Sequence, residues 1–248
     1  MHLSWVIPAY NEEKRIAKTL REVDEYLRSR LARKLFSSYE IIVANSASQD
    51  RTAAIVSDLT SQIQNLTLVN VENRGKGWAV KTGMLRARGD IRLFSDADNS
   101  TAPEYFDAMV PLFSQGYDIV ISSRDLKDAP GASRDVKEPM LREILGNLGN
   151  VVIQIFGVWG IWDTQNGFKA FSAPAAQEIF SRSQVKGWAF DIEVLALARR
   201  LGYKIGIIPI RWRFDPDSKL TPGVYFEVLG DVFRIRWNLI TGQYRLRS

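Results

Sequence analysis

Two aspartates separated by one residue, Asp96 and Asp98, are the side chains of this sequence best suited to hold a cation. They follow an apolar run, 91–95, that predicts a buried strand. The sequence has no cysteine and one histidine, His2, so a metal site must use carboxylate oxygens, which suit Mg²⁺ or Mn²⁺. Such an ion can bridge a diphosphate and offset charge on a leaving nucleotide. Taken alone, two aspartates around one residue more often form an ordinary turn.

Three other motifs favour a binding site at the same place. The stretch 6–13 is a strand-to-helix junction that could seat a base and ribose, with Asn11 where a helix N-cap belongs. Segment 74–77 has two cations and two glycines, which allow close approach to a phosphate. Arg124 follows another predicted strand and is expected to direct its guanidinium to the same edge. Each motif alone is more often a solvated loop, but together they favour function.

The elements that must position these residues alternate between short apolar runs and amphipathic stretches. This alternation predicts an α/β fold, with a mostly parallel sheet flanked by helices and with ligands at the carboxyl ends of the strands. Strands are expected at 3–7, 39–44, 66–71, 91–95, 118–122, 164–171 (after a turn) and 204–212. Helices are expected at 16–27, 52–61, 75–88 (after a short loop), 103–113, 143–161, 173–182 and 191–201. Residues 125–138 predict a long surface loop.

Composition limits the remaining choices. The 248 residues suit one α/β domain. The net charge of +5 would fit a nucleic acid, an anionic membrane or a phosphorylated substrate. Nucleic acid is disfavoured because the basic residues are scattered, no recognition motif is present and the acidic pair would repel phosphates without a metal. The beginning of the sequence lacks signal-peptide features, so a cytoplasmic protein is expected. The apolar run 151–162 is too short to span a bilayer and is expected to be core or interfacial.

The order of motifs 7–13, 73–77, 96–98 and 123–124 resembles the family-two inverting glycosyltransferases. Segments 163–171, 188–193 and 217–220 are similar to the branch of dolichyl-phosphate mannose synthases and, more closely, dolichyl-phosphate β-glucosyltransferases. The resemblance covers nearly the whole chain. It implies a GT-A (Rossmann-like) fold in one domain, with 1–124 as the nucleotide-sugar half and 125–248 as the acceptor half. It also implies a UDP-glucose or GDP-mannose donor, a polyprenyl-phosphate acceptor and Mg²⁺ or Mn²⁺.

The resemblance assigns roles by position. It implies that Asp96 and Asp98 hold the metal and the diphosphate, and that Arg124 meets the acceptor phosphate. Nucleotide contacts are implied for Pro8, Tyr10, Glu12 and Lys76. Further substrate contacts are expected from Asn11, Asn45, Gly77, Ala97, Trp188 and Lys219, and weaker acceptor contacts from Arg134, Lys137 and Arg142. The acceptor oxygen is already anionic, so positioning and charge neutralisation, rather than a strong base, would provide most of the catalysis.

One departure from the family lies after the second predicted strand. Relatives have two aspartates where this sequence has Asn45 and Ser46. Asn45 can still hydrogen-bond a base edge with a donor and an acceptor, but it loses the charge-assisted bond. This leaves the donor base open, and it leaves a non-catalytic or weakly active sugar-nucleotide-binding protein as the alternative function.

Three features keep two interpretations each. Asp191 is either a helix cap or a catalytic group that faces the sugar or orients the acceptor. The polar cluster Gln165, Asn166 and Lys169 could bind sugar hydroxyls or phosphate, whereas Asn166 and Gly167 could equally form a turn. The amphipathic segment 225–240 either lies in the headgroup layer, peripheral to the cytoplasmic face of a membrane, or packs on the sheet or on a second copy of the chain.

Overall fold

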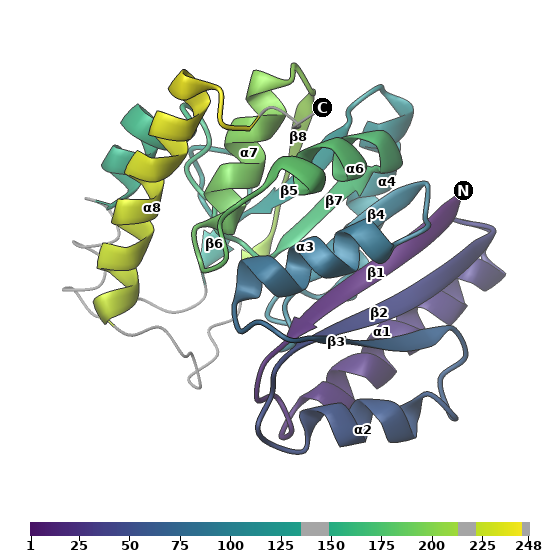
Figure 1. Cartoon of the computed structure of the whole chain (residues 1–248). Helices are drawn as coiled ribbons and strands as arrows, with labels where there is room; N and C mark the ends of the chain where they lie inside the picture. The colour runs from purple at the N-terminus through teal and green to yellow at the C-terminus, as the bar shows by residue number, and fades with distance from the viewer. Residues whose placement is uncertain (135–148, 213–221, 245–248) are drawn as a thin grey trace.

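The computed structural model describes residues 1–134, 149–212 and 222–244 (Figure 1). Its centre is a seven-stranded sheet in the order β3-β2-β1-β4-β7-β5-β8. The strands are β1 (His2–Ala9), β2 (Ser38–Ser46), β3 (Leu66–Val71), β4 (Ile91–Ser95), β5 (Ile119–Ser123), β7 (Phe168–Ser172) and β8 (Ile205–Pro209). Strand β7 runs antiparallel to both neighbours, and the other pairs are parallel. The predicted mostly parallel sheet is confirmed.

Helices cover both faces of the sheet (Figure 1). Helices α1 (Ile16–Ala32), α2 (Thr52–Leu59) and α4 (Phe106–Ser114), with the short η1 (Pro103–Tyr105), pack on one face. Helices α3 (Lys76–Arg86), α6 (Ala173–Arg182) and α7 (Phe190–Arg200) pack on the other. Alternate residues of β1 supply each side, because Trp5 joins the first core and Val6 the second. Helix α8 (Pro222–Thr241) and the π-helix η2 (Ile153–Gly157) lie outside α7.

The register of the sheet brings the ends of distant segments together. Ala9, Asn45 and Asn70 are neighbours across β1, β2 and β3. Ser95, the last residue of β4, lies opposite Phe168, the first residue of β7. The residues just after β4 and just before β7 therefore meet at the same edge as the ends of β1, β2 and β3.

One expected helix cap and one expected strand are wrong. Helix α1 begins at Ile16, as expected, but Arg15 is its N-cap residue. Asn11 adopts a φ of 54°, and its side chain accepts a hydrogen bond from the Gln49 backbone N–H (2.8 Å) instead of capping the helix. The expected strand 204–212 is divided into β8 and β9 (Arg211–Trp212). Strand β9 leaves the main sheet and pairs with β6 (Ser133–Arg134) in a separate two-stranded sheet.

The helix expected at 143–161 is described from residue 149, and it ends earlier than predicted. Its last turn is η2. The Gln154 side chain then makes two hydrogen bonds to the backbone that follows this turn. Gln154 accepts a hydrogen bond from the Gly160 N–H (2.6 Å) and donates one to the Ile161 carbonyl (2.5 Å). Gly160 has a φ of 74°, which a glycine adopts without steric cost.

Ala47 lies in the left-handed region, with a φ of 53°, which is strained for a residue with a Cβ. We expect Ala47→Gly to raise the free energy of unfolding by about 0.5–1 kcal/mol, because glycine relieves this strain. Ala54→Gly is the matched control, since Ala54 is an exposed helical residue of α2 where glycine costs about 1 kcal/mol. Urea denaturation measures both variants, and a loss of stability in Ala47→Gly would contradict the expectation.

Candidate functional site

Asp96 lies at the centre of the site, immediately after β4. Its Oδ1 is 2.7 Å from Nζ of Lys76, the first residue of α3. Its carboxylate also packs against Gly167, where an added Cβ would lie 2.1 Å from Asp96 Oδ2. The predicted turn at Asn166 and Gly167 therefore has a steric role, because only glycine leaves room for the Asp96 carboxylate in this position.

Lys76 is a cation held between carboxylates and aromatic rings. Its Nζ lies 5.2 Å from the centroid of the Trp188 ring and 5.9 Å from that of Phe190. Burial opposes its charge, but the carboxylates of Asp96, Asp191 and Asp98 outweigh this effect and raise the pKa of Lys76. Lys76 thus remains protonated at neutral pH, beside the residue that the sequence predicts as a metal ligand.

Asp98 accepts a hydrogen bond from the Ser100 backbone N–H at 2.9 Å through Oδ1. Burial and the neighbouring Asp96 charge raise the pKa of Asp98, so a divalent cation would relieve the repulsion between the two carboxylates. The described residues contain no group of three or more metal-ligating side chains. Two hard carboxylates suit Mg²⁺ or Mn²⁺, which commonly take their other ligands from substrate phosphates and water, so the residues fit such an ion.

Lys169 and Asp191 form a buried ion pair. The distance from Lys169 Nζ to Asp191 Oδ1 is 2.6 Å, and the two side chains are 0% and 3% exposed. The interpretation of Asp191 as a helix cap is wrong, because Ala189 is the N-cap residue of α7 and makes no side-chain capping bond. Burial raises the pKa of Asp191, although Lys169 and Lys76 favour its charged form. Lys169, Asp191, Lys76 and Asp96 thus form a chain of alternating charges.

Asn166 is buried and fastens the site to the sheet. Its Nδ2 donates to Ser122 Oγ (2.8 Å) in β5, and its Oδ1 accepts from Thr101 Oγ1 (3.4 Å). Its backbone carbonyl accepts a hydrogen bond from Lys169 Nζ. Gln165, in contrast, is exposed. Of the predicted polar cluster, Asn166 and Lys169 are held by other protein groups, and Gln165 presents its side chain to solvent.

The predicted nucleotide-binding residues lie at the ends of β1, β2 and β3. The Arg74 guanidinium lies 4.4 Å from the centroid of the Tyr10 ring. The Asn45 side chain is 5% exposed and donates through Nδ2 to Asn70 Oδ1 (2.9 Å). Ser46 accepts a hydrogen bond from the Gly75 N–H at 2.8 Å. Ser46, which the sequence marked only as a lost aspartate, therefore anchors the turn that carries Lys76.

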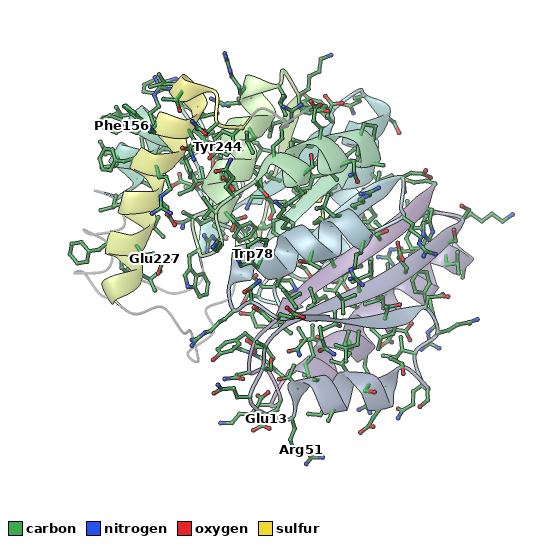
Figure 2. The ribbon with its side chains drawn as sticks, in the orientation of Figure 1. Glu13, Arg51, Trp78, Phe156, Glu227 and Tyr244 are labelled. Atoms are coloured by element: carbon green, nitrogen blue, oxygen red, sulfur yellow. The ribbon has the colours of Figure 1, made fainter. Side chains whose placement is uncertain are left out.

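The loops after β1 and β2 are joined by hydrogen bonds. The Glu12 N–H donates to Thr52 Oγ1 (2.7 Å), and the Arg51 N–H donates to Glu13 Oε2 (3.1 Å). Figure 2 shows Glu13 and Arg51 side by side at this end of the molecule. A cavity of about 870 Å³ opens next to these loops, and its walls include Glu12 and Asp98. The first motif and Asp98 thus line the same cavity.

Arg124 is held by Asp163, a residue that sequence reasoning did not assign to the site. Asp163 Oδ2 accepts from Arg124 Nε (2.8 Å) and from the Arg124 backbone N–H (2.7 Å), and Oδ1 accepts from Nη2 (2.7 Å). Asp163 is 3% exposed. A fork of this kind fixes the plane of a guanidinium. The position of Asp163 at the start of the motif 163–171 was the signal in the sequence that could have assigned it to the site.

The remaining predicted residues are distributed as follows. Pro8, Gly77 and Ala97 are buried, and Trp188 is half-buried beside Lys76. The backbone of Arg134 belongs to β6. The side chain of Arg134 and the residues Lys137, Arg142 and Lys219 lie outside the described residues.

Known proteins are similar to this chain over most of its length. A family model described as glycosyl transferase family 2 matches residues 4–180. A dolichyl-phosphate beta-glucosyltransferase of Trichomonas vaginalis is 36% identical over 241 residues, covering 95% of this chain and 73% of the relative. The Dictyostelium discoideum enzyme of that name is 35% identical over 260 residues, with coverages of 100% and 78%. The human enzyme is 32% identical over 258 residues, with coverages of 99% and 78%.

Solved structures support the fold. Glucosyl-3-phosphoglycerate synthase from Mycobacterium tuberculosis, crystallised with Mn²⁺, UDP and phosphoglyceric acid, superposes with a TM-score of 0.67 at 20% identity, covering 100% of this chain and 80% of that one. Mannosyl-3-phosphoglycerate synthase from Rubrobacter xylanophilus gives a TM-score of 0.68 at 16% identity, with coverages of 100% and 76%. The family match covers more than half of the sequence, and the fold is GT-A. The chain therefore belongs to glycosyl transferase family 2.

Proposed function

We propose that this protein transfers glucose, with inversion, from a nucleoside diphosphate sugar to a polyprenyl phosphate. The observation that carries the proposal is the contact of Lys76 with Asp96 beside Asp98 at the carboxyl edge of the sheet, where a diphosphate can meet both a cation and metal ligands. The identity of 32–36% to dolichyl-phosphate beta-glucosyltransferases over nearly the whole chain supports glucose and a dolichyl-type acceptor. Mannose from GDP-mannose is the second choice.

On the donor side, residues 1–124 form the nucleotide-sugar half. Pro8, Tyr10 and Glu12 contact the nucleotide, and the buried Asn45 amide, which donates to Asn70, holds the ends of β2 and β3 together beside them. Asp96 and Asp98 would hold Mg²⁺ or Mn²⁺, which supplies charge neutralisation to the leaving diphosphate. Lys76 adds a second positive charge at the same phosphate.

On the acceptor side, residues 125–248 form the second half. Arg124 binds the acceptor phosphate in an orientation fixed by Asp163. The phosphate oxygen attacks the anomeric carbon from the face opposite the diphosphate, and the bond between that carbon and the diphosphate oxygen breaks, so that the nucleotide takes the electron pair. The attacking oxygen is already anionic, so no group has to remove a proton from it.

We further propose that the protein contacts a membrane through an apolar surface on α8 and η2, at the cytoplasmic face. Helix α8 packs Val228, Val232 and Ile235 into the core. Its opposite side leaves large apolar residues exposed, as does the segment of η2: Phe226, Phe233, Trp237, Ile240, Ile155 and Trp159. The Phe156 and Phe233 rings lie 5.0 Å apart and join the two elements, and Figure 2 shows Phe156 beside α8. No helix among the described residues is long and apolar enough to cross a bilayer.

A double substitution tests the membrane contact. Phe233→Ser with Trp237→Ser removes two aromatic groups that are 51% and 66% exposed, each worth about 1.5–3 kcal/mol when buried. We expect binding to anionic phospholipid vesicles, measured by sedimentation, to fall by about 100-fold. Donor binding in solution, measured by calorimetry, is the control and should not change. Undiminished vesicle binding would refute this surface.

A donor panel tests the reaction. The purified protein is incubated with polyprenyl phosphate, Mg²⁺ or Mn²⁺, and each of UDP-glucose, GDP-mannose and other nucleotide sugars, and both glycolipid and free nucleotide are measured. We expect UDP-glucose to give most product and a metal chelator to stop the reaction. If one donor binds tightly and none yields glycolipid, the protein is a sugar-nucleotide-binding member of the family, which the loss of aspartates at Asn45 and Ser46 would explain.

A further inference from the structure

The loop 183–187, which joins α6 to α7, lies directly against the turn that carries Lys76. A Cβ added at Gly75 would be 2.4 Å from the Lys186 carbonyl oxygen, and one at Gly77 would be 2.4 Å from the Val185 carbonyl oxygen. The Trp78 N–H also donates to the Lys186 carbonyl at 3.3 Å. Backbone thus packs on backbone with no side chain between them, so a displacement of the loop must displace the Lys76 turn.

Glu193 of α7 holds this loop in place. Its Oε2 accepts from the Val185 N–H (2.9 Å) and the Gln184 N–H (3.0 Å), and its Oε1 accepts from the Gln184 N–H (2.9 Å) and from Tyr244 OH (2.8 Å). The residue is 0% exposed. A buried carboxylate with these partners fixes the position of both backbone amides, because each would otherwise be left without an acceptor away from water.

The same loop is attached to α8 and the segment after it. Gln184 Nε2 donates to the Gln243 carbonyl at 3.0 Å. Gly187 packs against Glu227, since an added Cβ would lie 2.3 Å from Glu227 Oε1. Figure 2 shows Glu227 and Tyr244 at the two ends of the α8 region and Trp78 at the end of α3 nearest to α8. Glu193 therefore joins three parts: α7, the loop beside Lys76, and the C-terminal segment.

We propose that Glu193 is a positioning residue for the donor: it sets the place of Lys76 through the loop 183–187 and ties that place to the C-terminal segment through Tyr244. The assignment of a nucleoside diphosphate as the ligand of Lys76 rests on the function proposed above. Glu193 itself touches no substrate. Its effect is expected on the donor, because the loop packs on the turn of Gly75 and Gly77 that carries Lys76.

The test uses the full chain with Glu193→Gln, which keeps the size of the side chain but replaces one acceptor oxygen by an amide donor facing a backbone N–H. We expect the Kd for UDP in the presence of Mn²⁺, measured by calorimetry, to rise about 10-fold, and the KM for the donor to rise with it. The KM for polyprenyl phosphate should stay within about two-fold. A residue with a purely structural role would not separate the two KM values.

Asp24→Asn is the matched control. Asp24 is a carboxylate only 6% exposed that accepts a hydrogen bond from Tyr39 OH (3.0 Å), but it lies on α1, across the sheet from the loop. It should lower the Tm without changing the Kd for UDP. Tyr244→Phe removes one donor to Glu193 and leaves both backbone bonds, so its Kd should rise by a smaller factor, about 2–3-fold.

An unchanged UDP affinity in folded Glu193→Gln, or an equal loss in Asp24→Asn, would overturn the proposal. If Glu193→Gln does not fold, Tyr244→Phe decides, and no change in its UDP affinity refutes the link to the C-terminal segment. Failure of the unsubstituted protein to bind any nucleoside diphosphate would instead refute the proposed function.

Discussion

Replacing Asp98 with alanine is expected to abolish metal-dependent donor binding and to lower kcat/KM by about 10³-fold. Asn45 and Ser46 carry no charge, so the proposed metal site depends on the carboxylates of Asp96 and Asp98. With Asp98 gone, Asp96 remains in contact with Lys76, and the site loses its second hard oxygen ligand. Calorimetry with UDP, with and without Mn²⁺, measures the binding, and a glycolipid assay measures the turnover.

Two variants make this result interpretable. Asp58→Ala removes an exposed carboxylate of α2 and should leave both measurements unchanged. Asp98→Asn keeps an oxygen that can accept the Ser100 N–H but lacks the charge, so it should bind UDP equally with and without Mn²⁺. Unaltered turnover in Asp98→Ala would remove the acidic pair from the mechanism.

Lys169→Met is expected to have the largest effect on stability. It leaves the Asp191 carboxylate buried without its closest partner, and breaking a buried ion pair from one side costs about 3–5 kcal/mol. Denaturation in guanidinium chloride measures the loss. The loss should be smaller at pH 5 than at pH 8, because the pKa of Asp191 is already raised by burial, and a folded state that binds the extra proton is favoured as the pH falls.

The double variant Lys169→Met with Asp191→Leu separates stability from function. Replacing both charges of a buried pair with apolar groups is often neutral or stabilising, so the double variant should recover most of the lost stability. It should not recover turnover, because Asp191 also acts on Lys76, raising its pKa. Full turnover in the double variant would show that the pair serves the fold alone.

The fold could be predicted from the sequence to the extent that local patterns determine it. The apolar runs of β1 to β5 are short and bounded by turn residues, and their alternation with amphipathic helices predicts a sheet whose carboxyl ends carry the ligands. Asp96, Asp98 and Lys76 could therefore be placed together from residues far apart in sequence. The structure brings them together, and adds the direct contact of Lys76 with Asp96.

What could not be predicted depends on tertiary contacts with no local signal. Asp191 looks like a helix cap in sequence, and only the packing of β7 under α7 supplies Lys169 as its partner. Asparagine is a common N-cap residue, but the loop after β2 gives the Asn11 side chain a different hydrogen-bond partner. The structural role of Ser46 could not be predicted, because its hydrogen-bond partner Gly75 lies 29 residues away in the sequence.

Strand β7 has a consequence for how the chain folds during synthesis. It lies between β4 and β5, so these two strands do not pair with each other, although β5 follows β4 directly among the strands of the sheet along the chain. A nascent chain that has emerged only through residue 124 therefore has β5 without a neighbour and an open edge on β4. Such non-local pairing delays closure of the sheet and exposes strand edges meanwhile. A fragment of residues 1–124 would also lack Gly167, which packs against the Asp96 carboxylate and is translated later.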